Sequence, residues 1–118
     1  MPANPRPRPA SGERRAIAAF LNRLRGTYDV SGSILFGSRA RGEHRADSDL
    51  DLAVLLRGQR GDLVEAKLDM AGLAFDVLLE TGILVQALPL WEEDLAHPER
   101  FSNPALLRRI EREGIRLG

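Results

Sequence analysis

Two aspartates, with a glycine–serine pair ahead of them, are the residues of this chain best suited to chemistry on phosphate groups. Gly37 and Ser38 follow the apolar run at residues 33–36, and Asp49 and Asp51 alternate at the start of a second apolar run. A glycine lets the backbone approach a phosphate closely, and backbone N–H groups at a helix start attract anions. The Ser38 hydroxyl can also donate to a phosphate oxygen. Because successive side chains of a strand point to opposite faces, Asp49 and Asp51 are expected to share one face.

Carboxylate oxygens at this spacing suit a divalent metal. Asp49 and Asp51 offer the hard oxygen ligands that Mg²⁺ prefers when substrate phosphates supply the other ligands. Two Mg²⁺ ions could stabilise both the attacking and the leaving oxygen of a displacement at phosphorus. Aspartate is also a poor strand former, so two of them in an apolar run need a local reason. We therefore predict a metal and nucleoside triphosphate site, with Asp49 and Asp51 as metal ligands and catalytic residues.

Arginines next to the serine could neutralise a triphosphate. Arg39 and Arg41 lie in the segment Gly37–Gly42, and guanidinium groups bind phosphate oxygens well. The alternative for each of them is an arginine of a solvated loop that pairs with Glu43 or Asp47. The residue types leave both interpretations open.

The elements that must position these groups can be inferred from hydrophobic spacing. Residues 30–36 and 49–56 are predicted to be strands, and residues 57–61 a turn. Ser11 is predicted to cap a first helix that stops at Gly26. The apolar residues of this helix recur at helical spacing: Ile17, Phe20, Leu21 and Leu24.

A long helix is predicted between the second and third strands. Asp62 and Glu65 resemble a capping box, and Gly82 is a typical residue after a helix end, so we expect a helix from about residue 62 to residue 81. Its apolar face would carry Leu63, Ala66, Met70, Leu73, Ala74, Val77 and Leu78.

The remaining elements are shorter. Residues 83–88 are predicted to form a third strand with Pro89 near its end, and residues 91–96 an acidic turn or short helix. Asn103 and Pro104 are predicted to open a last helix that runs through Glu113.

The region from Leu35 to Leu56, read as a whole, resembles the signature of a known family. Residues 35–42, LFGSRARG, and residues 48–54, SDLDLAV, are similar to the signature of the DNA polymerase β-like nucleotidyltransferase superfamily. The short chain resembles its minimal nucleotidyltransferase group, and residues 106–115 are similar to the tail of that group. The resemblance implies an α/β (α+β) fold with a small mixed sheet of the polymerase β palm type, flanked by helices in a single domain. It also implies transfer of a nucleoside monophosphate from a triphosphate to a hydroxyl, with pyrophosphate leaving.

The chain departs from that family at a third carboxylate. Family members that catalyse transfer carry this acid on the strand that follows the helix, but residues 83–88 contain none, and Gln86 is their one polar residue. Asp76 is the remaining candidate for a third catalytic carboxylate, if residues 73–80 formed a strand. The long helical periodicity favours Asp76 as an exposed helix residue instead.

Two functions follow from the resemblance. The first is an Mg²⁺-dependent nucleotidyltransferase that acts on a protein or small-molecule hydroxyl. The alternative is an antitoxin that binds nucleotide, or catalyses weakly, and neutralises a helical HEPN-type ribonuclease partner. Transfer requires Asp49 and Asp51, whereas simple occlusion of a partner should survive their replacement by asparagine.

Composition bounds the remaining possibilities. A chain of 118 residues that is 43% hydrophobic and 29% charged predicts one globular domain over residues 11–118, after a disordered tail rich in proline and arginine at residues 1–10. The 17 basic and 17 acidic residues balance, so no global field favours nucleic acid, which is not expected as a direct, stable partner. Cysteine is absent and no apolar run approaches the ~20 residues that cross a bilayer. We expect a cytoplasmic protein without a membrane partner.

Overall fold

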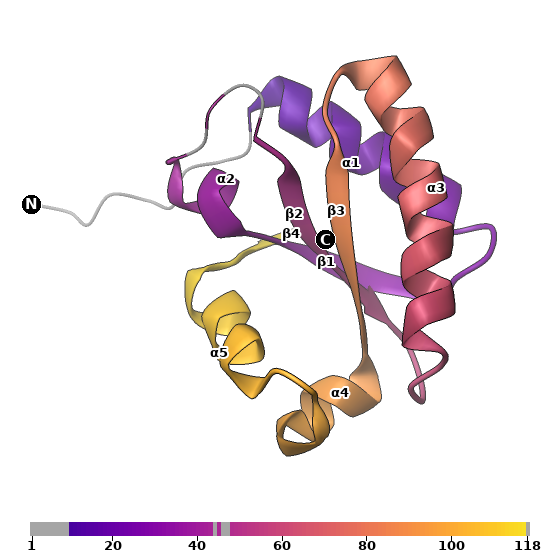
Figure 1. Ribbon diagram of the computed structural model, residues 1–118, viewed down its shortest axis with the longest axis vertical. Helices are drawn as coiled ribbons and strands as arrows, with labels where there is room; N and C mark the ends of the chain where they lie inside the picture. The colour runs from indigo at the N-terminus through magenta and orange to yellow at the C-terminus, as the bar shows by residue number, and fades with distance from the viewer. Residues whose placement is uncertain (1–9, 44, 46–47, 118) are drawn as a thin grey trace, which may run out of the picture.

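A four-stranded mixed sheet forms the centre of the molecule (Figure 1). The structure, a computed structural model, describes residues 10–43, 45 and 48–117. The strand order is β3-β2-β1-β4, with β1 (Val30–Phe36) antiparallel to both β2 (Leu50–Leu56) and β4 (Ile115–Leu117). β3 (Val85–Trp91) is parallel to β2. The expected α+β fold with a small mixed sheet is confirmed.

Helices cover both faces of this sheet. α1 (Ser11–Leu24) and α3 (Leu63–Thr81) lie on one face, and α5 (Pro104–Glu113) lies on the other (Figure 1). The shorter helices connect these layers: α2 (Gly37–Arg41) follows β1, and α4 (Glu92–Ala96) with the 3₁₀ turn η1 (Pro98–Arg100) leads from β3 to α5.

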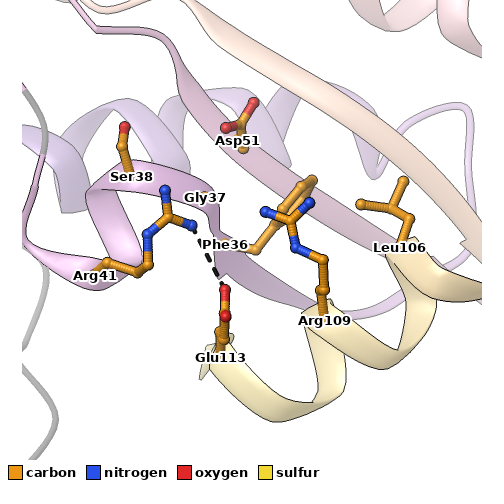
Figure 2. Close-up of a pocket in the computed structure, with 8 residues that line it drawn as sticks. All are labelled: Phe36, Gly37, Ser38, Arg41, Asp51, Leu106, Arg109 and Glu113. Atoms are coloured by element: carbon orange, nitrogen blue, oxygen red, sulfur yellow. Dashed lines mark hydrogen bonds and ion pairs between the residues drawn. The ribbon is translucent and has the colours of Figure 1, made fainter.

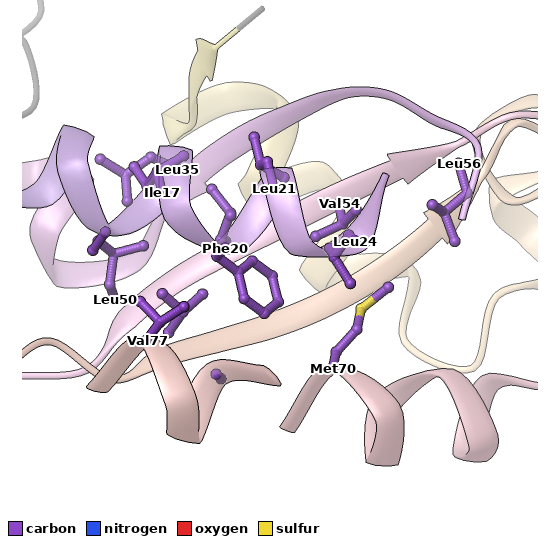
Figure 3. Packing of buried hydrophobic residues seen from close by; sticks show 14 of the residues in the cluster. Ile17, Phe20, Leu21, Leu24, Leu35, Leu50, Val54, Leu56, Met70 and Val77 are labelled. Carbon is purple, nitrogen blue, oxygen red and sulfur yellow. The ribbon is translucent and has the colours of Figure 1, made fainter. Parts of the chain in front are cut away.

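Each face of the sheet has its own hydrophobic core. Phe20 and Leu24 of α1, Met70 of α3 and Leu50 of β2 are almost completely buried in the first core (Figure 3). The second core lies under α5 and contains Ala53, Leu55, Leu88, Leu90, Phe101, Leu107 and Ile110. Leu50, Leu52 and Val54 of β2 belong to the first core, so Asp51, Ala53 and Leu55 face α5.

The helix ends follow the chemistry of capping groups. Asp62 Oδ1 accepts a hydrogen bond from the Glu65 N–H at 3.0 Å, and Gly82 ends α3 with a φ of 80°, as expected. The prediction that Ser11 caps α1 was wrong by one residue. Ala10 is the N-cap and has no side-chain cap, and its N–H donates to Glu13 Oε1 at 2.9 Å.

The C-terminal third contains two corrections to the predicted strands. β3 begins at Val85 rather than residue 83 and continues through Pro89 to Trp91. Proline is tolerated inside β3 because β3 is the edge strand, where a missing N–H need not break a ladder bond. β4 was not predicted; its three residues pair with Ser33, Ile34 and Leu35 of β1.

The outer face of α3 carries an apolar stripe that the sequence interpretation had not singled out. Val64, Leu68, Phe75 and Leu79 keep 67%, 69%, 55% and 72% of their surface exposed. On the predicted core side of α3, Ala66, Met70, Ala74 and Val77 are buried, and Leu63, Leu73 and Leu78 are half-buried. Within the described residues, no helix has the length and apolar character needed to cross a membrane. The predicted tail at residues 1–10 lies, apart from Ala10, outside the described residues.

Candidate functional site

A cavity of about 350 Å³ opens between the β1–α2 junction, β2 and α5 (Figure 2). Arg41 of α2 and Arg109 of α5 extend into this opening, and Asp51 lies on its β2 wall. Its lining residues are Phe36, Gly37, Ser38, Arg41, Asp51, Leu106, Arg109 and Glu113. The structure thus brings together four of the residues that the sequence singled out: Gly37, Ser38, Arg41 and Asp51.

Gly37 lies directly against the carboxylate of Asp51. It has a φ of 73°, a backbone conformation that side chains disfavour. A Cβ atom at this position would overlap Asp51 Oδ2. Glycine is therefore required both by the turn from β1 into α2 and by the close approach of the chain to Asp51.

The two aspartates at the start of β2 influence each other electrostatically. Asp51 pairs with Phe36 in the sheet register and is half-buried, as is Asp49, which immediately precedes the strand. Burial raises the pKa of Asp51, the negative charge of Asp49 raises it further, and the positive charge of Arg41 opposes both. Asp49 is close enough to repel Asp51, although its side chain does not line the cavity.

This pair of carboxylates fits a divalent cation. A cation between Asp49 and Asp51 would relieve their repulsion, and both supply the hard oxygen donors that Mg²⁺ prefers. Among residues 10–43, 45 and 48–117, no group of three or more histidines, cysteines, aspartates and glutamates is arranged to hold a metal. Asp49 and Asp51 would supply two carboxylates to such a cation, and substrate phosphates and water would complete its coordination.

Arg41 lines the cavity and also forms ion pairs with neighbouring acids. It forms ion pairs with Glu43 at 3.0 Å and with Glu113 at 3.5 Å, so the predicted pairing with Glu43 is present. The hydrogen bond to Glu43 is the main reason that the pKa of Arg41 is raised. Because Arg41 also lines the cavity, its guanidinium is held at the mouth of the pocket by two acids that an anionic ligand could displace.

Arg39 does not reach the cavity. Its side chain is only 5% exposed and forms an ion pair with Glu13 of α1 at 2.8 Å. Its Nε and Nη2 atoms donate to the carbonyl oxygen of Ser48 at 3.0 and 2.6 Å. This position differs from the predicted contact with a nucleotide, and the ion pair is with Glu13 rather than Glu43; Asp47, the other acid of the alternative, lies outside the described residues.

The structure adds a second wall that sequence reasoning had missed. Leu106, Arg109 and Glu113 of α5 line the cavity, and the exposed side chain of Arg109 forms no hydrogen bond or ion pair with any described residue. A signal for this wall existed in the sequence. Residues 106, 109 and 113 follow helical spacing on one face, while Leu107 and Ile110 turn toward the core.

Neither Asp76 nor Gln86 lines the pocket. Asp76 is exposed on α3, across the sheet from the cavity, so the structure does not bring it to Asp51. The helix that the sequence favoured at this position is confirmed. Gln86 pairs with Asp51 in the register of β3 and β2, so an amide stands on the strand beside Asp51.

The chain is similar to known proteins over most of its length. A family model described as "Polymerase beta, Nucleotidyltransferase" matches residues 19–117. "Putative protein adenylyltransferase MJ0604" of Methanocaldococcus jannaschii is 33% identical over 84 residues, which cover 69% of this chain and 76% of that protein. A crystal structure described as "a putative nucleotidyltransferase from Sulfolobus solfataricus" aligns over 92% of this chain and 87% of its own, with a TM-score of 0.49 and 16% identity.

Proposed function

Because the chain belongs to the polymerase β nucleotidyltransferase family, we propose that it transfers a nucleoside monophosphate from a nucleoside triphosphate to an acceptor hydroxyl with the help of Mg²⁺. The observation that carries this proposal is the convergence of Asp51, Ser38, Arg41 and Arg109 on one cavity. Two arginines and a hydroxyl donor suit a polyphosphate, and a carboxylate beside them suits the cation that accompanies it.

The residues divide the work of binding between them. The Ser38 hydroxyl would donate to a phosphate oxygen, and Arg41 and Arg109 would neutralise phosphate charge from opposite walls of the pocket. Asp49 and Asp51 would hold Mg²⁺, which when bound stabilises charge on the attacking and leaving oxygens. Gly37 keeps the chain close enough to Asp51 for these groups to act on one ligand.

The reaction itself is an in-line displacement at the α-phosphorus. The acceptor oxygen forms a new bond to this phosphorus, the bond from phosphorus to the oxygen that bridges to the β-phosphate breaks, and pyrophosphate leaves. The hydroxyl proton must pass to a base. Asp76 could be that base only if residues 73–80 formed a strand. They form α3 instead, across the sheet from the pocket, so Asp76 is not proposed for this role.

A protein is the acceptor class that we favour. The relative from Methanocaldococcus jannaschii carries the name of a protein adenylyltransferase, and this supports ATP as donor and a protein hydroxyl as acceptor. A small-molecule acceptor is the alternative.

A thermal-shift titration tests the nucleotide and metal site without knowledge of the acceptor. Each nucleoside triphosphate is titrated with and without Mg²⁺ on the wild type, on Asp49→Asn/Asp51→Asn, and on Glu111→Gln as a control in an exposed acid of α5. At ~100 times its dissociation constant, a ligand should stabilise the wild type by ~2.7 kcal/mol. We expect a metal-dependent shift that the control retains and the double variant loses. A wild type that no triphosphate stabilises would overturn the proposal.

A second function is favoured by one observation. Gln86, rather than an acid, stands beside Asp51, so the family's third carboxylate has no counterpart on β3. This supports an antitoxin that binds nucleotide and neutralises a HEPN-type ribonuclease by occlusion. Such neutralisation should survive Asp49→Asn/Asp51→Asn, whereas neutralisation by nucleotide transfer should be lost in that variant.

A further inference from the structure

A buried ion pair between α1 and α2 has no role in the binding scheme above. Glu13 Oε2 and Arg39 Nη1 lie 2.8 Å apart, and their side chains are only 6% and 5% exposed. Charged side chains are seldom buried this deeply, and a buried pair often contributes little net stability because both charges lose their water. The pair therefore needs an explanation other than stabilisation of the core.

The other edge of the Arg39 guanidinium points to that explanation. Nε and Nη2 of Arg39 both donate to the carbonyl oxygen of Ser48, at 3.0 and 2.6 Å. Ser48 immediately precedes Asp49, and β2 begins only at Leu50. Arg39 thus holds the peptide group between Ser48 and Asp49. This peptide group lies before the start of β2, outside the hydrogen-bonded sheet.

Glu13 supplies the rigid end of this connection. Its Oε1 atom accepts from the Ala10 N–H at the start of α1, while Oε2 accepts from Arg39. The planar guanidinium then links this helix start to the Ser48 carbonyl through a fixed geometry that a lysine could not reproduce.

We propose that Arg39, held by Glu13, is a positioning residue that sets the place of Asp49 for the cation and nucleotide. This inference rests on the proposed function, and it replaces the predicted contact between Arg39 and nucleotide with an indirect action through the Ser48 carbonyl. Both edges of the Arg39 guanidinium are occupied by protein atoms, so Arg39 can hold the Ser48 carbonyl without contacting the ligand.

The test needs a variant that folds. Arg39→Met alone would leave the Glu13 carboxylate buried without its partner, a change that is usually strongly destabilising. The double variant Glu13→Gln/Arg39→Met removes both charges, and the glutamine oxygen can still accept from Ala10. The control is Arg23→Met/Glu80→Gln, which removes an ion pair of the same 2.8 Å length that is exposed, joins α1 to α3 and lies away from the pocket.

Two readouts separate positioning from simple support of the fold. The first, in ligand-free protein, is the fast backbone motion of Asp49 by ¹⁵N relaxation. We expect Asp49 to become more mobile in the double variant but not in the control, while Val54 in the core stays rigid in both. The second is the dissociation constant of ATP in the presence of Mg²⁺, which we expect to rise at least tenfold in the double variant. Unchanged Asp49 motion, or wild-type affinity in the double variant, would overturn the proposal.

A mutant cycle with Asp49→Asn distinguishes positioning from direct contact. If Arg39 acts through Asp49, the effect of Glu13→Gln/Arg39→Met on affinity should largely disappear in the Asp49→Asn background. Additive effects would indicate that Arg39 contacts the nucleotide and would overturn the positioning role. Should the wild type bind no nucleotide, the proposed function fails, and the motion of Asp49 still decides whether Arg39 orders this loop.

Discussion

At the scale of single residues, the raised pKa of Asp51 predicts how the stability of the protein depends on pH. Burial and the neighbouring Asp49 raise its pKa in the folded protein, whereas in the unfolded chain it returns to the usual aspartate range. Between these two pKa values the folded state binds more protons, so stability should fall as the pH rises through this window. Below this pH window Asp51 is protonated in both the folded and the unfolded state, so its ionisation no longer destabilises the folded state.

The variant Asp51→Asn removes this ionisation. Without Mg²⁺, we expect it to melt at a higher temperature than the wild type near neutral pH, with the difference shrinking as the pH falls from the raised pKa of the folded state to the usual pKa of the unfolded chain. Melting curves from pH 3 to pH 8 measure this, with Glu111→Gln as control. A wild type that gains stability over Asp51→Asn as the pH rises would contradict the assigned direction of the pKa.

The position of Arg109 in the pocket predicts that its replacement weakens the binding of ATP. It lines the pocket without a described partner, so an incoming phosphate need not displace another group from it. Hydrogen bonds to charged groups contribute ~1.5–3 kcal/mol, so Arg109→Ala should raise the dissociation constant of ATP about tenfold or more. Arg108→Ala, the exposed neighbour outside the pocket, is the matched control. Equal effects of the two variants in calorimetric titrations would indicate general charge attraction instead of a contact.

The residues of the site were predictable only where they are close in sequence. Gly37, Ser38, Arg41 and Asp51 are joined by one short motif, and all four line the pocket. Arg109 lies near the other end of the chain. Its spacing from Leu106 and Glu113 predicts that the three share one face of α5, but the spacing does not predict which part of the protein that face contacts. Tertiary packing of α5 over β1 and β2 supplies that information.

At the scale of elements, two glycines predict opposite responses to alanine. Gly72 lies within α3 with open space where a Cβ would be, so Gly72→Ala should stabilise the protein by ~0.5–1 kcal/mol. At Gly114, between α5 and β4, a Cβ would overlap Ile34 Cγ2 and the carbonyl oxygen of Ile110. Gly114→Ala should therefore cost ~1–3 kcal/mol. Urea denaturation measures both free energies of unfolding, and equal effects of the two substitutions would contradict the packing described.

The elements also show what local sequence signals can and cannot reveal. α3 was predicted within a residue at each end because Asp62 and Gly82 satisfy its terminal backbone groups locally. β3 was misplaced because Pro89 looked like a strand end, and only its position at the sheet edge makes this proline compatible with the strand. β4 has three residues and exists through its pairing with β1, which is distant in sequence.

At the scale of the whole molecule, the order of the strands follows from simple connections. The unit β2-α3-β3 crosses over one face, so its strands are parallel, whereas β1 and β2 are joined through a shorter connection and are antiparallel. These connections place α3, with its apolar stripe, on one face and leave the other face for α5 and the pocket. The mixed sheet was therefore predictable from the order of elements, whereas the pocket depends on how α5 returns across the sheet.

Because α5 crosses back over the sheet and forms one wall of the pocket, we expect a bound ligand to stabilise α5. The pocket joins the β1–α2–β2 region to α5, and α5 is held between the Asn103 cap and the short strand β4. A nucleotide that contacts both walls should reduce the local opening of α5, because the opened form loses part of the binding site. Hydrogen exchange with and without Mg²⁺ and ATP should show slower exchange for residues 104–113 than in the free protein.

The residues of α3 on the opposite face are the internal reference for this experiment. Their exchange should change little, since α3 does not line the pocket, and Asp49→Asn/Asp51→Asn should abolish the effect on α5. If ATP binds while α5 exchanges at its free rate, the nucleotide contacts only the β1–α2–β2 wall. Arg109 would then have no part in binding, because its helix would open as freely with the ligand as without it.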